Sequence, residues 1–313
     1  MAKLLYEPGH VTKKGWWTLR DFVRRASVLR RARNYDGVVI HREAALIGPA
    51  IYERLLARTG TPIIYDFDDA IWLQQPEHRS MLSPLRFQRK TKAICRLAKA
   101  VTVGNPFLAA FARKHNSSVT IVPSTIELDD YPAVAEPANQ DQFVVCWTGT
   151  RTTLAHFEHA REALESLARQ LRLVVKVICS EPPERPIAGA EMRFVPWSAA
   201  TEAQDVGDCH VGIMPLPDNE FTRGKSGMKA LQYMATGRPV VASPVGVNSQ
   251  LVRPGENGFL AANSQEFVQA LSALAASRDL RARLGAAARG LIEHEYSAAA
   301  GAGRFAAVVN ALV

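Results

Sequence analysis

Short apolar segments alternate with longer amphipathic segments along this chain, in two series separated by a segment rich in proline and acidic residues. Short apolar segments are typical of strands buried on both faces, and their alternation with helices predicts parallel sheets covered by helices. The separating segment, residues 131–142, contains Pro132 and Pro137 and few apolar residues, so we interpret it as a linker. We therefore expect an α/β fold with two Rossmann-like domains.

The predicted domains are 1–137 and 138–296, followed by a C-terminal helix over 297–313 that packs back on the first domain. Expected strands cover 36–41, 61–66, 100–103, 119–122, 143–148, 173–179, 192–195, 210–214 and 239–243. Expected helices cover 43–58, 81–98, 153–170, 225–235, 264–276 and 278–293, and another starts at Asn105-Pro106. Only residues 3–6 could form a strand before the basic segment 16–33, so we expect the first domain to be shortened at its N-terminus. Ligands bind beyond the carboxyl ends of such strands, so we expect the active cleft between the domains.

Positive charge is concentrated in the first half of the chain. Residues 1–140 hold 21 Lys and Arg residues against 13 Asp and Glu, whereas residues 141–313 hold 17 of each. The stretch from His78 to Ile126 has no acidic residue. Such a basic region favours phosphate-bearing partners, and Trp16 and Trp17 beside several arginines predict a helix on an anionic membrane. The alternative is a solvated, arginine-rich helix face. We expect no nucleic-acid partner.

The chain has no apolar run of the ~18–20 residues that a membrane-spanning helix needs, and its start lacks the apolar core of a signal peptide. Its four cysteines lie far apart in apolar segments and form no C-x-x-C pair: Cys95, Cys146, Cys179 and Cys209. We predict buried, reduced thiols in a cytoplasmic protein that associates peripherally with the inner face of the membrane.

Two segments of the second half suit a diphosphate. A glycine-containing loop leads into a predicted helix whose first turns hold Lys225 and Lys229, and Gln232 is expected on the same side. Backbone N–H groups and lysines at a helix start attract phosphate. At Gly149-Thr150-Arg151 a predicted strand turns into a second helix start, where Arg151 can add charge-assisted hydrogen bonds. A surface helix with two lysines and an ordinary capped turn are the alternatives.

Asp66, Asp68 and Asp69 follow a predicted strand and admit several interpretations. They could form the metal-binding D-x-D of a GT-A glycosyltransferase or the nucleophile and acid/base pair of a haloacid-dehalogenase-type phosphatase, both with Mg²⁺ or Mn²⁺. They could also bind acceptor hydroxyls or cap the next helix. His156 and His159 have a metal-binding spacing, but no third ligand is evident. We expect no metal site and no cofactor.

Several motifs, in order, resemble the GT-B retaining glycosyltransferases of family 4 (glycosyl transferases group 1). Gln232-Tyr-Met-Ala-Thr-Gly237-Arg-Pro-Val-Val-Ala-Ser243 is similar to the donor-domain helix and strand of that family. The segments 253–260 and 208–216 resemble its P-G-x-N-G-x-L turn and the strand before that helix. In the first half, 65–72, 104–108 and 122–128 resemble one branch of the family. The resemblance covers about residues 35–310.

The resemblance implies a GT-B fold, with two Rossmann-like domains facing across a cleft. It implies transfer of a sugar from a nucleotide diphosphate sugar to a hydroxyl of a glycan or lipid-linked acceptor, with retention, without metal, in glycan or glycolipid synthesis. The implied catalytic residues are Arg223, Lys225 and Lys229. The implied donor-binding residues are Gly149, Thr150, Arg151, Trp197, Gln232 and Gly246. The implied acceptor-side residues are His41, Arg42, Asp66, Asp68, Asp69 and Asn105.

The chain departs from the family at two positions. A glutamate usually found at the position of Gln232 is associated with the donor ribose, and its partner eight residues earlier is here Gly224. Glutamine accepts a hydrogen bond from a hydroxyl but carries no charge. A non-catalytic protein that binds a nucleotide sugar or glycan is therefore an alternative hypothesis, and a D-x-D phosphatase is a second one.

Overall fold

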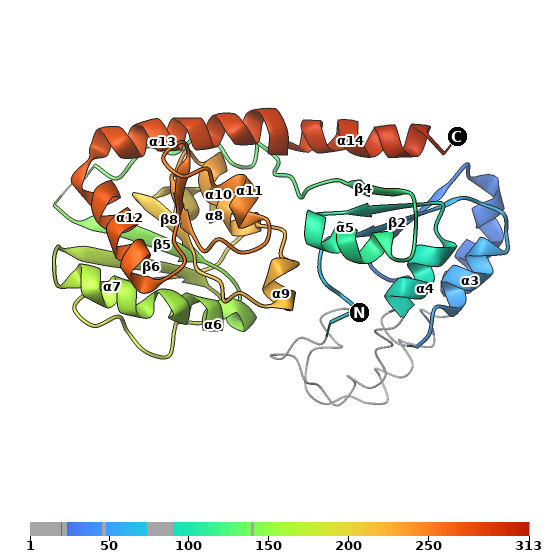
Figure 1. Ribbon diagram of the computed structural model, residues 1–313, viewed down its shortest axis with the longest axis horizontal. Coiled ribbons are helices and arrows are strands. Elements are labelled where there is room, and N and C mark those ends of the chain that lie inside the picture. Colours follow the sequence, from blue (N-terminus) through green and yellow to red (C-terminus); the bar gives the residue numbers. More distant parts are fainter. Residues whose placement is uncertain (1–19, 21–23, 46–47, 74–89, 139–140, 313) are drawn as a thin grey trace. The chain divides into compact units, whose positions relative to one another are not determined.

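The computed structural model describes residues 20, 24–45, 48–73, 90–138 and 141–312, which form two compact units, each built on one parallel sheet (Figure 1). The first unit comprises the described residues up to Val103, Leu108–Ile121 and those from Phe305 onward. The second comprises Gly104–Phe107 and Val122–Arg304.

The sheet of the first unit has the strand order β1-β2-β3-β4, with every neighbouring pair parallel. The strands are β1 (Val38–His41), β2 (Ile63–Phe67), β3 (Ala100–Val103) and β4 (Val119–Ile121). All four lie within two residues of the predicted limits. The predicted strand at residues 3–6 lies outside the described residues, as does the first half, 81–89, of the predicted helix 81–98.

The helices α3 (Ile51–Ala57) and α4 (Lys90–Leu97) belong to the first unit, as does α5 (Pro106–Arg113) from Leu108 onward. The helix predicted from residue 43 was wrong at its start, because α3 begins only at Ile51. The intervening segment is held instead by side chains: the Ala44 amide donates to the Glu53 carboxylate at 3.0 Å, and Lys90 pairs with Glu43 at 2.9 Å.

The sheet of the second unit has the order β10-β9-β8-β5-β6-β7, again with all pairs parallel. Its strands are β5 (Phe143–Thr148), β6 (Leu173–Cys179), β7 (Glu191–Pro196), β8 (Val211–Met214), β9 (Val240–Ala242) and β10 (Gly258–Leu260). The chain builds outward from β5 in one direction and from β8 in the other. The carboxyl ends of β5 and β8 therefore flank a topological switch point, where open α/β sheets bind their ligands.

The principal helices of the second unit are α7 (Arg161–Ala168), α8 (Glu202–Gly207), α10 (Met228–Ala235), α12 (Ser264–Ala276) and α13 (Arg278–Leu291). The continuous helix predicted over 153–170 was wrong. Short turns replace its first half: η3 (Arg151–Thr153), α6 (Leu154–Phe157) and η4 (Glu158–Ala160). Here Phe157 packs on Trp147, with ring centroids 5.6 Å apart.

The segment predicted as a linker is bound along the second unit. Val134 donates its amide to the Thr236 carbonyl at 3.2 Å and accepts a hydrogen bond from Arg238. The Tyr131 carbonyl accepts from Arg289 at 2.5 Å. The domain boundary predicted at 137/138 therefore differs from the observed division, in which the second unit already includes Val122.

Helix α14 (Ala298–Asn310) falls within the predicted C-terminal helix 297–313, and its last residues belong to the first unit. Val308 packs there against Ile64 and Ala100 of the sheet. Among the described residues, no helix is both long and apolar enough to cross a membrane.

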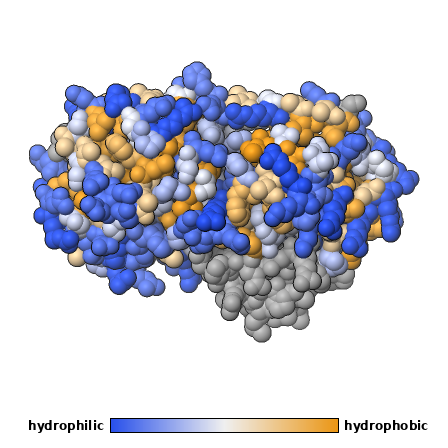
Figure 2. Space-filling view, viewed as in Figure 1, coloured by the Kyte–Doolittle hydropathy of each residue, from blue (hydrophilic) through white to orange (hydrophobic). Residues whose placement is uncertain are grey.

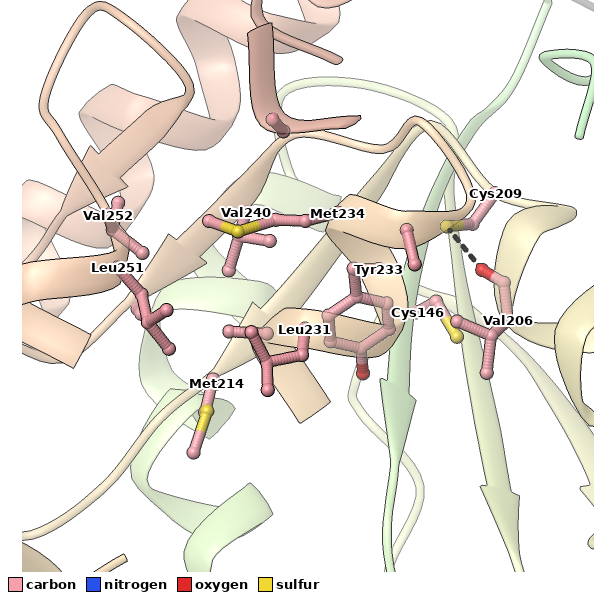
Figure 3. Close-up of a cluster of buried hydrophobic side chains, with 14 of the residues drawn as sticks. Cys146, Val206, Cys209, Met214, Leu231, Tyr233, Met234, Val240, Leu251 and Val252 are labelled. Atoms are coloured by element: carbon pink, nitrogen blue, oxygen red, sulfur yellow. Dashed lines mark hydrogen bonds between the residues drawn. The ribbon is translucent and has the colours of Figure 1, made fainter. Parts of the chain in front are cut away.

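The core beneath α10 joins that helix to the centre of the second sheet (Figure 3). Tyr233 lies there among Cys146, Val206 and Leu231, and its hydroxyl accepts a hydrogen bond from the Thr148 amide at 2.8 Å. This contact ties α10 to the carboxyl end of β5. The four cysteines are free and buried, as predicted.

Candidate active site

The turn that follows β5 lies at the switch point and holds three predicted donor-binding residues. Gly149 approaches the chain closely, since a Cβ there would lie 2.4 Å from the Trp147 ring. Thr150 and Thr153 form a capping box, in which the Thr150 amide donates to Thr153 Oγ1 at 3.0 Å. The side chain of Arg151 pairs with Glu181 at 3.3 Å, and both are exposed. Hydrogen bonds between its own threonines therefore stabilise the turn, and Arg151 is already paired with the Glu181 carboxylate.

The loop between β8 and α10 borders the same switch point and holds Lys225. The helix predicted to start at Lys225 begins at Met228, so this lysine precedes the helix. The reason is Gly227, whose φ of 76° is left-handed and whose added Cβ would lie 2.5 Å from Leu251. The Lys225 ammonium lies 4.2 Å from the centroid of the Phe221 ring. Aromatic rings attract cations at this range.

The backbone of Gly246 packs closely against this loop at Arg223. Its φ is 57°, and a Cβ there would lie 2.6 Å from the carbonyl oxygen of Arg223. The side chain of Arg223 forms a two-point ion pair with Asp218, at 2.6 and 3.0 Å. Gly246 therefore positions the backbone of the loop, whereas the charge of Arg223 is offset by a carboxylate that the sequence interpretation did not include.

Lys229 lies in the first turn of α10, half-buried, with its ammonium 5.6 Å from the centroid of the Trp147 ring. Burial, together with the nearby charge of Lys225, lowers the pKa of Lys229 to about 8. Burial and both lysines also lower the pKa of His156 to about 4, so this histidine is neutral at pH 7. Two ammonium groups from the loop and the helix therefore gather beside β5, in a setting that favours a bound anion.

Gln232, on the next turn of α10, is buried and belongs to a hydrogen-bonded chain. Its Nε2 donates to the Tyr131 hydroxyl at 2.9 Å, and that hydroxyl donates to Glu202 Oε2 at 2.5 Å. The other oxygen of Glu202 accepts from Trp197 Nε1 at 2.6 Å. Trp197 directly follows β7 and is 49% exposed. The structure thus joins two predicted donor-binding residues, Gln232 and Trp197, through two residues that the sequence analysis missed.

In the first unit, parallel register brings His41, Asp66 and Thr102 side by side on β1, β2 and β3. Asp66 Oδ2 lies 2.7 Å from His41 Nδ1, and Asp66 Oδ1 accepts from the Thr102 hydroxyl at 2.6 Å. Because Asp66 contacts Nδ1, the His41 ring has a defined orientation with Nε2 on its far side. Thr102 was not predicted, since a single threonine in an apolar strand carries no sequence signal of its role.

Arg42 follows β1 in the left-handed region, with a φ of 60°. Its amide donates to the Asp66 carbonyl at 2.7 Å, and its guanidinium contacts Asp68 at 2.8 Å and Asp69 at 3.6 Å. Burial alone would raise the pKa of Asp68, but the hydrogen bond and charge of Arg42 outweigh it and the pKa is lowered. Five predicted acceptor-side residues therefore come together, with their carboxylates already bound to protein groups.

Asn105 has a different hydrogen-bond partner. It is buried, belongs to the second unit, and donates from Nδ2 to the Lys225 carbonyl at 3.1 Å. Within the described residues, no group of three or more His, Cys, Asp or Glu side chains could hold a metal ion. Asp66 contacts His41 and Thr102, and Asp68 contacts Arg42.

Comparisons with known proteins agree with this fold. Residues 142–277 match the family model described as glycosyl transferases group 1. A glycosyltransferase from Rickettsia africae aligns over 98% of this chain and 84% of its own, with 12% identity and a TM-score of 0.68. HepE from Anabaena, solved with UDP and glucose, aligns over 91% of this chain and 80% of its own, with 16% identity and a TM-score of 0.65.

A sucrose-phosphate synthase from Thermosynechococcus elongatus aligns over 89% of this chain and 74% of its own, with 17% identity and a TM-score of 0.64. A search of the curated proteins gave no match. The GT-B fold class and the resemblance to glycosyltransferases that the sequence motifs predicted are confirmed.

Proposed function

We propose that this chain is a glycosyltransferase that moves a sugar from a nucleotide diphosphate sugar to an acceptor hydroxyl. The observation that carries the proposal is the pair Lys225 and Lys229, placed beside the Gly149 turn at the switch point of the second sheet. A diphosphate is the ligand that two ammonium groups and a glycine turn at this point suit. The match of residues 142–277 to the group 1 model supports the same assignment.

The proposed chemistry is departure of the diphosphate with retention at the sugar. Negative charge grows on the leaving oxygen as the glycosidic bond breaks, and fixed cations stabilise that charge most where water is excluded. Lys225 and Lys229 would perform this role. Arg151 and Arg223 are paired with Glu181 and Asp218, so each would contribute only if the donor displaces its carboxylate.

On the acceptor side, we assign hydroxyl binding to the His41 and Asp66 pair. A histidine oriented by a carboxylate offers one ring nitrogen to a hydroxyl, and Thr102 holds that carboxylate in place. Because Asp68 and Asp69 offset the charge of Arg42, this group suits a polyhydroxylated ligand better than a phosphate. A glycan hydroxyl is therefore the proposed acceptor.

Calorimetric titration with UDP-, GDP- and ADP-sugars tests the donor assignment. We expect one nucleotide class to bind, and release of free sugar over hours would show that the bound donor reacts. Binding without release or transfer to any glycan acceptor would favour a non-catalytic binding protein. Failure of every nucleotide sugar to bind would contradict the assignment.

Activity is expected to survive removal of metal ions. Fixed lysines carry the proposed role that Mg²⁺ or Mn²⁺ plays where a D-x-D motif binds the donor. Transfer measured after dialysis against EDTA should equal that of untreated protein. Loss of activity that returns with Mn²⁺ would instead assign Asp66 and Asp68 to a metal.

We also propose that the first unit attaches to an anionic membrane, where a lipid-linked acceptor would lie. The outer face of α3 supports this, because Ile51, Arg54, Leu55 and Arg58 follow helical spacing and are all exposed. Ile51 is 53% and Leu55 39% exposed. Figure 2 shows apolar residues among hydrophilic ones on the visible face. The predicted Trp16 and Trp17 helix lies outside the described residues.

Replacing Arg54 and Arg58 with serine is expected to weaken binding to anionic vesicles by about 30-fold. Each arginine near an anionic surface contributes about 1 kcal/mol, and 1.4 kcal/mol corresponds to a factor of ten. Co-sedimentation with phosphatidylserine vesicles at low salt measures the effect. The matched control replaces Arg169 and Arg172, two exposed arginines of the second unit, and should bind as the unaltered protein does. Equal binding by both variants would contradict the assignment of α3.

A further inference from the structure

Gln232 stands where the resembling family has a charged glutamate, and its amide has two different ends. Oxygen Oε1 accepts hydrogen bonds, whereas Nε2 only donates. A ribose hydroxyl can bind either end, but a site that replaces a carboxylate needs the accepting end. What matters for donor binding is therefore which end of this buried amide is held by the protein.

The hydrogen bonds from Glu202 through Tyr131 to Gln232 determine which end is held. Tyr131 has one hydroxyl proton, and at 2.5 Å it goes to the Glu202 carboxylate, the stronger acceptor. The Tyr131 oxygen can then only accept from Gln232, whose Nε2 lies 2.9 Å away. Burial and the hydrogen bond to Glu202 raise the pKa of Tyr131, so the phenol keeps its proton at neutral pH. The amide is thereby held by Nε2, and Oε1 is left as the acceptor.

Glu202 also holds a second side chain. Its Oε1 accepts from Trp197 Nε1 at 2.6 Å, while Trp197 as a whole residue remains 49% exposed. An indole that is fixed by its N–H and open on its ring offers a stacking surface for a planar base. One carboxylate therefore orients both an aromatic surface and a buried amide.

We propose that Glu202, acting through Tyr131, is a positioning residue that fixes Gln232 to accept a hydrogen bond from the donor ribose and holds Trp197 for the nucleobase. This inference rests on the proposed nucleotide-sugar donor. It assigns to Glu202, thirty residues before Gln232 in sequence, the negative charge that position 232 lacks. In this arrangement the charge acts on the ribose through the orientation of a neutral amide.

The sharpest test restores the glutamate. In Gln232→Glu, two carboxylates compete for the one proton of Tyr131 and repel each other. We therefore expect nucleotide affinity to fall about tenfold or more, which corresponds to about 1.4 kcal/mol of binding free energy. In Gln232→Glu combined with Glu202→Gln, the Tyr131 proton is free to bond to the carboxylate introduced at position 232. The amide introduced at position 202 can then accept from Trp197 and donate to Tyr131. We expect the double variant to regain affinity to within about threefold of the unaltered protein.

Titrations use UDP, GDP and ADP with their 2′-deoxy and 3′-deoxy forms, and thermal unfolding confirms that each variant is folded. Tyr131→Phe provides a second measurement, because it removes the proton that orients the amide while keeping the ring. We expect it to lose the preference for the ribonucleotide over one deoxy form, with the affinity for that deoxy form retained. A mere loss of packing would weaken both forms equally.

Two results would overturn the inference alone. One is a Gln232→Glu variant that binds as well as the unaltered protein, and the other is a double variant that binds no better than the single one. If none of the three nucleotides binds the unaltered protein, the proposed function fails together with the inference.

Discussion

Replacing Lys225 with alanine is expected to lower kcat/KM for sugar transfer by about 30- to 900-fold. This corresponds to a loss of about 2–4 kcal/mol in stabilisation of the transition state, comparable with the loss of about 2.7–4 kcal/mol when one fixed donor to a developing negative charge is removed. Lys225 lies in a loop whose path is set by Gly227 and Gly246. Its ammonium lies over the Phe221 ring, 4.2 Å from the ring centroid.

Steady-state kinetics with saturating acceptor measures this effect, together with donor affinity by calorimetry. Arg169→Ala is a matched control, because Arg169 directly follows α7 just before β6 begins and therefore lies at the amino edge of the same sheet. This control removes one positive charge from the same unit and should leave kcat/KM unchanged. If Lys225→Ala retained both its turnover and its donor affinity, the diphosphate would have to bind elsewhere.

Replacing Lys229 with methionine is expected to have two opposite effects. It should abolish most of the donor affinity, because an ammonium beside the diphosphate is removed. It should also raise the free energy of unfolding at pH 7 by about 1–2 kcal/mol, the usual gain when an unfavourable functional group is replaced by a compatible one. Methionine fills a similar volume and lies well against the Trp147 ring, without the cost of burying a charge.

The pH dependence gives this prediction a second measurement. The pKa of Lys229 is about 8 in the folded chain and about 10.4 in an unfolded chain. Between these values the unfolded chain binds more protons, so this lysine makes stability rise with pH from about 8 to about 10.4. At pH 7 its destabilising effect is fully present. Urea unfolding at pH 7 and pH 9.5 should show this rise in the unaltered protein and a smaller one in Lys229→Met.

Donor binding should change in the opposite direction, with affinity falling as pH increases through about 8. Only the protonated amine attracts the diphosphate. If Lys229→Met unfolded more readily than the unaltered protein at pH 7, burial of the Lys229 charge would not destabilise the folded protein. The functional assignment of that charge would then lose its support.

Local patterns were sufficient to predict most of the second sheet. The limits of β5 and β6 are those predicted at 143–148 and 173–179, because each strand is mainly apolar and buried along its whole length, with Lys176 as the one charged residue in the two strands. Sequence motifs also identified the fold that the solved structures share. The helix predicted from Lys225 was less accurate, since periodicity does not show that Gly227 adopts a left-handed conformation.

The candidate site was predicted in part. His41 and Asp66 were identified at the carboxyl ends of predicted strands, but their contact depends on the register between β1 and β2. Arg151 lies in the turn after β5, as predicted, but Arg223, predicted in a loop, ends the short helix α9 (Glu220–Arg223). Their partners Glu181 and Asp218 were not identified, because an exposed acidic residue in a loop resembles any other.

The sequence by itself determined which segments become strands, except β10, and which cations follow the strands of the second sheet. Those properties depend on neighbours within about ten residues, through periodicity, backbone conformation and charge. Only the tertiary structure decided that Tyr131 and Glu202 act on Gln232, and that Thr102 supports Asp66. Tyr131 is 71 residues from Glu202 and 101 from Gln232 in sequence, and Thr102 is 36 from Asp66. A hydrogen bond forms only when folding brings both groups within about 3 Å.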